Sequence, residues 1–357
     1  MNRLHLDKTL FYALLVLAGL SVAVIYSASG MSLAATGAHL VRLALGFIVM
    51  FALAQTRPDS LERWTPYLYG AGLALLAAVM ALGVVGKGAQ RWLSLGFIRF
   101  QPSEIMKLAV PMMVAWYLAR ASLPPSWTRL AVGFAIILVP AVMIARQPDI
   151  GTALLVAAAG FFALFLAGLH WRVLGTLGAA AVATVPFAWH YLHDYQRKRI
   201  LTLIDPQADP LGSGYHTIQS MIAVGSGGFY GKGWLNSTQA HLEYLPESST
   251  DFIFAVFAEE FGLIGSLLLL GLYLLIATRA LIIAYLAQDS FTRLLAGSLG
   301  LTFFINFFVN MGMVTGILPV VGIPLPIFSY GGTAILTLMA AFGVLMSIQT
   351  HRKLAEG

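Results

Sequence analysis

Asp251 is the acidic residue of this sequence whose position best suits proton transfer. It ends a polar segment, 191–251, and the next residue opens an apolar run, 252–278. A carboxylate at the boundary between water and lipid, beneath a basic segment, can act as a general base toward a hydroxyl group. The alternative is structural: Ser249 or Thr250 would cap a helix, and Asp251 would favour its first turn. The local sequence leaves both interpretations open.

Further ionisable residues lie inside apolar segments, where each charge costs at least ~2.5–3.5 kcal/mol and usually has a partner or faces a cavity. They are Arg42, Glu104, Lys107, Asp149, Glu259 and Glu260. Glu104 and Lys107 are three residues apart and share a helical face, so they form either a structural ion pair or part of a polar site. Glu259 and Glu260 point roughly 100° apart on a helix. One of them could therefore simply hold a neighbouring helix.

A glycine-rich segment, 225–233, could present backbone N–H groups to a phosphate, with Lys232 beside them. It does not match a nucleotide-binding P-loop, because its first glycine spacing differs and Gly233 replaces the required Ser or Thr. A flexible turn explains the glycines equally well. The eight histidines show no metal-ligand spacing and the chain has no cysteine, so neither a histidine-built metal site nor a disulfide is expected.

These residues need elements that can hold polar groups in an apolar setting, and the composition indicates a membrane. Hydrophobic residues make up 59% of the 357 and charged residues 10%, whereas a soluble domain carries roughly 25% charged residues. The formal net charge of +6 would also suit nucleic acid, but no basic cluster is longer than Arg197-Lys198-Arg199. Basic loops at a membrane surface explain the excess, so no nucleic-acid partner is expected.

The fold class that follows is an all-α integral membrane protein with about ten transmembrane helices, since each span needs about 20 mostly apolar residues. Such runs lie near 9–27, 38–55, 66–86, 104–119, 129–145, 150–169, 173–190, 252–278, 294–313 and 333–350. Residues 1–357 would form a single polytopic membrane domain. The segment 191–251, between spans seven and eight, would be a large, partly ordered extracytoplasmic loop. A short helix at the membrane surface is expected between Leu211 and Gly228.

Ten spans place both termini on the same side of the membrane, and the basic residues indicate which side. With the termini in the cytoplasm, the inner segments hold eleven Lys and Arg residues, and the short outer loops hold four. The eleven include Arg3, Arg352 and Lys353, and the four include Lys87. The positive-inside rule therefore predicts cytoplasmic termini.

Three groups of motifs follow one another along the chain. The first joins GAQRW at 88–92 to QPSE at 101–104, and the second joins the glycines of 227–233 to PESSTDF at 246–252. The third, 310–334, contains ordered glycines and prolines and ends close after SYGG. Together they resemble the signature of the SEDS family (shape, elongation, division and sporulation proteins). The resemblance covers essentially the whole chain, which is most similar to the elongation members of the family.

This resemblance implies a peptidoglycan glycosyltransferase that polymerises lipid II into β-1,4-linked strands in the bacterial cytoplasmic membrane. It also implies a class B penicillin-binding protein as partner. Asp251 matches the essential acidic residue of the family and would be the base of an inverting displacement. Relatives often have His before Thr-Asp, whereas this chain has Ser249, so a role for that imidazole does not carry over.

The pyrophosphate and sugars of lipid II need further contacts that stabilise the charge of the leaving group. The candidates are Arg42, Arg91, Glu104, Lys107, Arg197, Lys232 and Ser329. The resemblance also suggests a divalent cation, Mg²⁺ or Mn²⁺, although no acidic cluster in the sequence marks a metal site. Two alternatives use the same buried charges and lipid contacts: a lipid II flippase, and a non-catalytic membrane scaffold for a cell-wall transpeptidase.

Overall fold

The fold is taken from a computed structural model of the whole chain. It describes residues 5–86, 89–94, 99–191, 194–209, 214–242, 244, 245 and 247–351. Several residues used above lie outside this part of the chain. They are Arg3, Lys87, Gly88, residues 211–213, Pro246, Arg352 and Lys353.

Each of the ten apolar runs overlaps one helix. These helices are Lys8–Ala28 (α1), Leu33–Ala54 (α2), Pro58–Leu82 (α3), Pro102–Ala119 (α4), Trp127–Ala145 (α5), Ile150–Leu166 (α6), Trp171–Tyr191 (α7), Ile253–Tyr285 (α11), Ser290–Val314 (α12) and Thr333–Thr350 (α13). Within the described residues, seven helices are long and apolar enough to cross a membrane, and α6 is a shorter apolar helix. The all-α membrane fold is thus confirmed, while the number of ten spans stays a prediction.

Some of the long helices begin at a residue whose side chain accepts a hydrogen bond from the first turn. Asp7 accepts a hydrogen bond from the N–H of Leu10 at the start of α1, and Asp149 and Asp289 make equivalent caps for α6 and α12. Side-chain oxygens at this position compensate donors that have no partner within the helix. The aspartates between the apolar runs therefore set the first residue of these three helices.

A small antiparallel sheet lies between α3 and α4, where no strand was predicted. Its strands are Val84–Gly86 (β1), Ala89–Ser94 (β2) and Arg99–Phe100 (β3), in the order β1-β2-β3. The predicted span 66–86 was wrong at its C-terminal edge, because α3 ends at Leu82 and the chain turns into β1. Gly83 ends the helix with an extended backbone, which leads directly into the strand.

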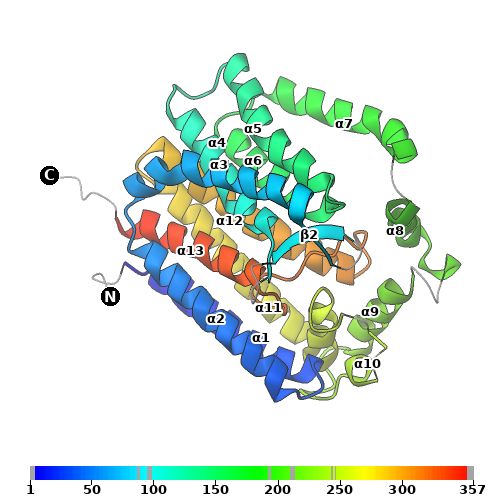
Figure 1. Cartoon of the computed structure of the whole chain (residues 1–357). Coiled ribbons are helices and arrows are strands. Elements are labelled where there is room, and N and C mark those ends of the chain that lie inside the picture. Colours follow the sequence, from blue (N-terminus) through cyan, green and yellow to red (C-terminus); the bar gives the residue numbers. More distant parts are fainter. Residues whose placement is uncertain are drawn as a thin grey trace.

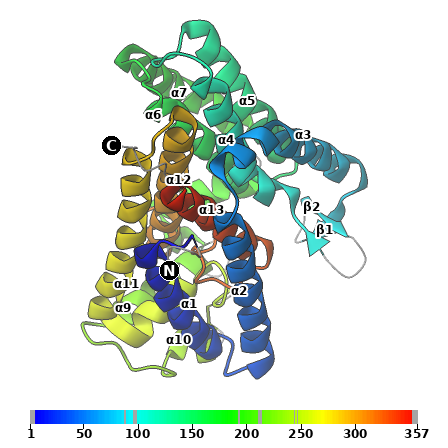
Figure 2. The ribbon, with the colours of Figure 1, turned by 90° about the vertical axis from the view of Figure 1, so that its left-hand side faces the viewer.

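The helices α4, α6, α11, α12 and α13 pack around a common centre, with α2 against α13 and α1 against α11. Figures 1 and 2 show α12 in the middle of this group, α1 and α2 side by side at one edge, and α7 at the opposite edge. Long apolar side chains fill the centre, and Tyr273 and Phe307 are fully buried there. This packing brings α4, α12 and α13 together around the site.

The long segment after α7 is partly ordered, as predicted. It contains Asp194–Ile204 (α8), a 3-10 turn at Pro206–Ala208, Tyr215–Ser226 (α9) and Thr238–His241 (α10). The short helix expected between residues 211 and 228 is α9. This helix packs on α11 and α12, and the Ser220 hydroxyl donates to the carbonyl of Val314 at 3.0 Å. The segment is therefore anchored beside the start of α11, where Asp251 lies.

Candidate active site

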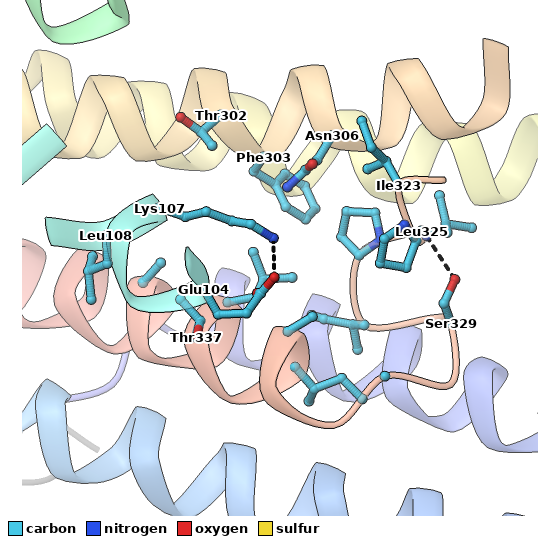
Figure 3. A pocket seen from close by; sticks show the side chains of 18 of the residues that line it. Glu104, Lys107, Leu108, Thr302, Phe303, Asn306, Ile323, Leu325, Ser329 and Thr337 are labelled. Carbon is cyan, nitrogen blue, oxygen red and sulfur yellow. Dashed lines mark hydrogen bonds and ion pairs between the residues drawn. The ribbon is translucent and has the colours of Figure 1, made fainter. Parts of the chain in front are cut away.

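A cavity lies between α4, α12, α13 and the segment that joins the last two helices (Figure 3). It contains about 700 Å³, including the open space at its mouth. Most of its lining is apolar, with Leu108 and Phe303 among the wall residues. Glu104 and Lys107 from α4 and Asn306 from α12 add polar groups. Such a mixture suits a ligand with both apolar and polar parts.

Glu104 and Lys107 form an ion pair across one turn of α4, with Nζ and Oε1 2.7 Å apart. Both side chains are largely buried, so each neutralises a charge that would otherwise be costly in this setting. The Oε2 atom of Glu104 and the Oδ1 atom of Asn306 are buried and have no hydrogen-bond partner in the protein. Both acceptors lie in residues of the cavity wall, where hydroxyl groups of a ligand can donate to them.

The segment 321–332, named here the SYGG loop, forms one wall of the cavity and is tied to the residues that precede Asp251. The Ser329 hydroxyl accepts a hydrogen bond from the N–H of Leu325 at 2.7 Å and donates to the carbonyl of Thr250 at 2.7 Å. The N–H of Tyr330 donates to the carbonyl of Ser249 at 2.8 Å. Ser329 was predicted to bind substrate, but its hydroxyl is occupied in holding this loop.

Asn310 makes a second link between the SYGG loop and Asp251. Its Nδ2 donates to the carbonyl of Asp251 at 2.9 Å and to the carbonyl of Ile323 at 2.7 Å. Gly322 is adjacent, with a φ of +78°, and a Cβ there would lie 3.4 Å from Oδ2 of Asp251. The carboxylate therefore lies against a backbone position that favours glycine. Asn310 is the first residue of the third motif, 310–334, and was not predicted as a site residue. Its position as a polar side chain in an apolar segment was the signal that could have identified it.

The helix-capping interpretation of Ser249 and Thr250 was wrong. Helix α11 begins at Ile253, and Phe252, which precedes it, provides no side-chain cap. The Thr250 hydroxyl donates instead to a carboxylate oxygen of Glu247 at 2.7 Å. Asp251 is partly exposed and lies in a turn before the helix.

Two arginines flank the SYGG loop. The Arg42 guanidinium stacks 4.0 Å above the ring of Tyr330, and its Nη1 atom is buried without a hydrogen-bond partner in the protein. Arg199 donates to the carbonyl of Val321 at 3.3 Å, one residue before Gly322. Arg42 was a candidate for pyrophosphate binding, whereas Arg199 was seen only as part of a basic cluster.

His216 is a further titratable group beside Asp251. Its ring stacks on that of Phe252 with centroids 5.8 Å apart. Burial lowers the pKa of His216 below its usual 6.5, against the opposing effect of Glu247, and Arg199 lowers it further. Neutral imidazole is thus the favoured form next to the turn that carries Asp251.

The other predicted cations have partners away from this cavity. Lys232 pairs with Glu259 at 2.6 Å. Arg91 donates to the carbonyl of Pro148 and lies 3.8 Å from Asp149. Arg197 donates to the carbonyl of His190 at 2.9 Å. Of the predicted site residues, the structure brings together Glu104, Lys107 and Ser329 in the cavity wall, with Asp251 and Arg42 against the SYGG loop.

The family to which this chain belongs follows from its similarity to known protein families. The family of cell cycle proteins that includes FtsW, RodA and SpoVE matches residues 3–354. The chain belongs to this family. The resemblance predicted from the motifs is therefore confirmed, and the whole described fold lies within the matched residues.

Several family members are similar over nearly their full length. The peptidoglycan glycosyltransferase MrdB of Escherichia coli K12 is 52% identical over 354 residues, which cover 99% of this chain and 96% of that protein. MrdB of Helicobacter pylori is 37% identical, with 98% and 91% covered. The probable peptidoglycan glycosyltransferase FtsW of Trichlorobacter lovleyi is 36% identical, with 98% and 94% covered. The chain is thus a bacterial membrane protein of this family.

Solved structures have the same fold. A chain from a peptidoglycan synthase complex that coordinates polymerization and crosslinking aligns with a TM-score of 0.85 and 30% identity, covering 98% of this chain and 99% of the other. The rod shape determining protein RodA of Thermus thermophilus aligns with a TM-score of 0.74 and 28% identity, covering 98% of each. The helical architecture described above is therefore that of known family members.

A divalent cation was a further expectation from the family. Among the described residues, no group of three His, Asp or Glu side chains converges to hold a metal ion. The divalent cation therefore stays a prediction.

Proposed function

We infer that this chain is a peptidoglycan glycosyltransferase that polymerises lipid II during cell elongation and shape maintenance. The observation that carries this conclusion is its 52% identity, over 99% of the chain, to the peptidoglycan glycosyltransferase MrdB of E. coli. The similarity to RodA of Thermus thermophilus supports the elongation role. The cavity that the SYGG loop borders supports an enzyme that handles an amphipathic substrate, since apolar walls enclose a few polar groups.

In the proposed reaction, the 4-hydroxyl of the acceptor sugar attacks the anomeric carbon of the donor. A bond forms between that hydroxyl oxygen and the anomeric carbon, while the bond from this carbon to the undecaprenyl pyrophosphate oxygen breaks. The configuration changes from α to β in one displacement, which needs one base and charge stabilisation at the leaving group. Asp251 is the proposed base and accepts the hydroxyl proton through its carboxylate.

The local structure supports Asp251 in this role. Hydrogen bonds from Ser329 and Asn310 hold the main chain around it, so its carboxylate can be directed at an acceptor hydroxyl without reorganisation. Glu104 is less suited to be the base, because Lys107 already neutralises it within the cavity. Arg42 beside the SYGG loop is the strongest proposed contact for the pyrophosphate, since its charge stacks on an aromatic ring and has no carboxylate partner among the described residues.

The proposed membrane placement is the bacterial inner membrane, with both termini in the cytoplasm and the active site on the outer side. The excess of basic residues in the predicted inner segments supports this orientation. A class B penicillin-binding protein is the proposed partner, because the chain resembles a subunit of a complex that couples polymerization to crosslinking. Lipid II and membrane lipids are the other proposed ligands.

The test is a lipid II polymerisation assay in detergent, with and without a class B partner, on wild type and Asp251→Asn. Loss of a general base costs roughly 10²–10⁴-fold in rate, so Asp251→Asn should form little or no glycan while its unfolding midpoint stays unchanged. Asp209→Asn, an exposed carboxylate of the same segment, is the matched control and should polymerise normally. Normal polymer from Asp251→Asn would reject Asp251 as the base. A protein that moves labelled lipid II across vesicles without making polymer would instead be a flippase.

A further inference from the structure

Helix α11 is interrupted at Gly262. Gly262 has φ +64° and ψ −163°, values outside the helical region. Because of this break, the N–H groups of Leu263 and Ile264 do not bond to the carbonyls of Glu259 and Glu260, as they would in a regular helix. Unpaired backbone groups cost several kcal/mol each in a membrane, so a break here needs other partners.

The partners come from residues 227–239, named here the dipping loop. The carbonyls of Gly228 and Phe229 accept hydrogen bonds from the N–H groups of Leu263 and Ile264, at 2.9 and 3.2 Å. The N–H groups of the next loop residues, Lys232 and Gly233, donate to the carbonyls of α11 freed by the break, both at 3.0 Å. The loop thus exchanges backbone hydrogen bonds with α11 on both sides of the interruption.

Two buried carboxylates of α11 also bind the dipping loop. Glu259 accepts from the Lys232 ammonium at 2.6 Å, the Ser237 hydroxyl at 2.6 Å and the Thr238 hydroxyl at 2.7 Å. Glu260 accepts from the N–H of Leu235 at 3.2 Å and from a serine of α1. The cation of the loop is therefore neutralised, and its polar backbone is held by protein groups. Nothing in these contacts requires the tip of the loop to remain in water.

The depth of the loop follows from its contact with α1. Helix α1 has 21 residues, about 31 Å at 1.5 Å per residue, close to the hydrocarbon thickness of about 30 Å. The indole N–H of Trp234 donates to the carbonyl of Ala23 at 3.1 Å. Ala23 lies five residues before the end of α1 at Ala28, which is about 7.5 Å along the helix axis. The loop therefore reaches below the end of α1.

Aromatic side chains at the tip of the loop point away from the protein. Phe229 is 68% exposed, Tyr230 is 85% exposed and Trp234 is 47% exposed. Their neighbours across the backbone hydrogen bonds, Leu263 and Ile264, are also exposed and belong to the apolar outer face of α11. The aromatic tip and this helix face make one continuous apolar surface. In Figures 1 and 2, α9 and α10, which flank the loop, lie beside α1 and α11.

We propose that the dipping loop inserts into the bilayer and that Phe229, Tyr230 and Trp234 contact lipid. The lipid region is the boundary of headgroups and acyl chains in the leaflet at the C-terminal end of α1. The rings of Tyr230 and Trp234 have a polar edge and favour this boundary, whereas Phe229 and the apolar face of α11 suit the hydrocarbon below it. Lipid explains the exposure of these rings better than water does, because in water the loop would present a large apolar surface to the solvent.

The chain contains no cysteine, so single spin labels can report the surroundings of the loop directly. Phe229→Cys and Tyr230→Cys would be labelled in the full chain in nanodiscs, and their accessibility to oxygen and to a water-soluble nickel complex measured. Leu267→Cys, on the exposed face of α11, is the lipid control, and Gln288→Cys, between α11 and α12, is the water control. The ratio of oxygen to nickel accessibility at positions 229 and 230 should be several-fold above that at 288.

Nickel accessibility at 229 and 230 equal to that at 288 would overturn the proposal, because the loop would then be in water. Low accessibility to both reagents would also overturn it, since a protein surface would cover the tip. Bimane at the same positions gives a second measurement. Lipids with a nitroxide near the carboxyl end of the acyl chain should quench it more than lipids labelled near the methyl end, and the reverse order would contradict the shallow depth argued above. None of these results depends on glycosyltransferase activity.

Discussion

Ser329→Ala tests whether the SYGG loop positions Asp251 or binds substrate. Ser329 is buried, with 2% of its surface exposed. Its hydroxyl accepts a hydrogen bond from the N–H of Leu325 and donates one to the carbonyl of Thr250, each at 2.7 Å. Alanine removes both hydrogen bonds and leaves a donor and an acceptor without partners. The Leu325 N–H is buried and the Thr250 carbonyl only partly so. At about 1–3 kcal/mol for a buried unsatisfied group, the free energy of unfolding should fall by at least about 1–3 kcal/mol.

The same change should act on the reaction through Asp251. The carbonyl that loses its partner belongs to Thr250, the residue before Asp251, so the turn that aims the carboxylate becomes looser. A misplaced catalytic group slows the chemical step more than it weakens binding. We therefore expect a lower kcat for lipid II polymerisation with a KM close to that of wild type.

Thr337→Ala is the matched control for this prediction. Thr337 lines the same cavity, and its hydroxyl donates to the carbonyl of Thr333 within α13 at 3.1 Å. That hydroxyl can be lost without consequence, because a helical carbonyl has its own backbone donor. Denaturant titration in mixed micelles and initial rates of glycan formation would be measured on both variants. If Ser329→Ala unfolded like Thr337→Ala and raised only KM, Ser329 would be a substrate contact and the positioning argument would be refuted.

Three further changes test other parts of the site. Gly322→Ala should destabilise by about 1–2 kcal/mol, because alanine is strained at φ +78°, and should slow polymerisation by placing a methyl group against Asp251; an unchanged rate in the lipid II assay would contradict this. Glu259→Ala should cost at least about 1–3 kcal/mol in denaturant titration, because it leaves the buried Ser237 hydroxyl without its acceptor. Glu260→Gln should cost less, and equal losses would contradict this argument. The lowered pKa of His216 means that the unfolded chain binds its proton first as the pH falls, so this residue's contribution to stability is present above pH 6.5 and is lost below it. The stability difference between wild type and His216→Gln should therefore change below pH 6.5 in unfolding titrations and stay constant above it.

The helices could be predicted because long apolar runs carry enough information to place them. Each of the ten runs overlaps a helix, and the Glu104–Lys107 ion pair was one of the two interpretations that a spacing of three residues allowed. The sheet between α3 and α4 was not predicted, since β1 has three residues and β3 has two. Strands this short have no alternating pattern to detect.

Residue spacing could not predict interactions between side chains that are far apart in the sequence. Lys232 was expected at a pyrophosphate, but the break at Gly262 draws the loop against α11 and pairs this lysine with Glu259. Glu260 does hold a neighbouring helix, through Ser27 of α1, as considered for one member of that pair. Whether Glu259 or Glu260 contacts the neighbouring helix depends on which segment packs against α11 at Gly262, and the sequence alone does not show this.

The distribution of charge around the SYGG loop limits which cations can stabilise a departing pyrophosphate. Lys107 and Lys232 each lie 2.7 Å or less from a carboxylate, so much of their field is cancelled before an anionic group approaches. Arg42 has no carboxylate within 4.0 Å in the described part of the chain, and it is held by the ring of Tyr330. An arginine fixed by stacking keeps its charge and its planar donors available to a phosphate at small entropic cost. This difference places the proposed base, Asp251, and the proposed pyrophosphate contact, Arg42, against different points of the SYGG loop. In the proposed transfer, the acceptor hydroxyl loses a proton while the pyrophosphate leaves the donor sugar, so the base and the cation must act at two separate positions.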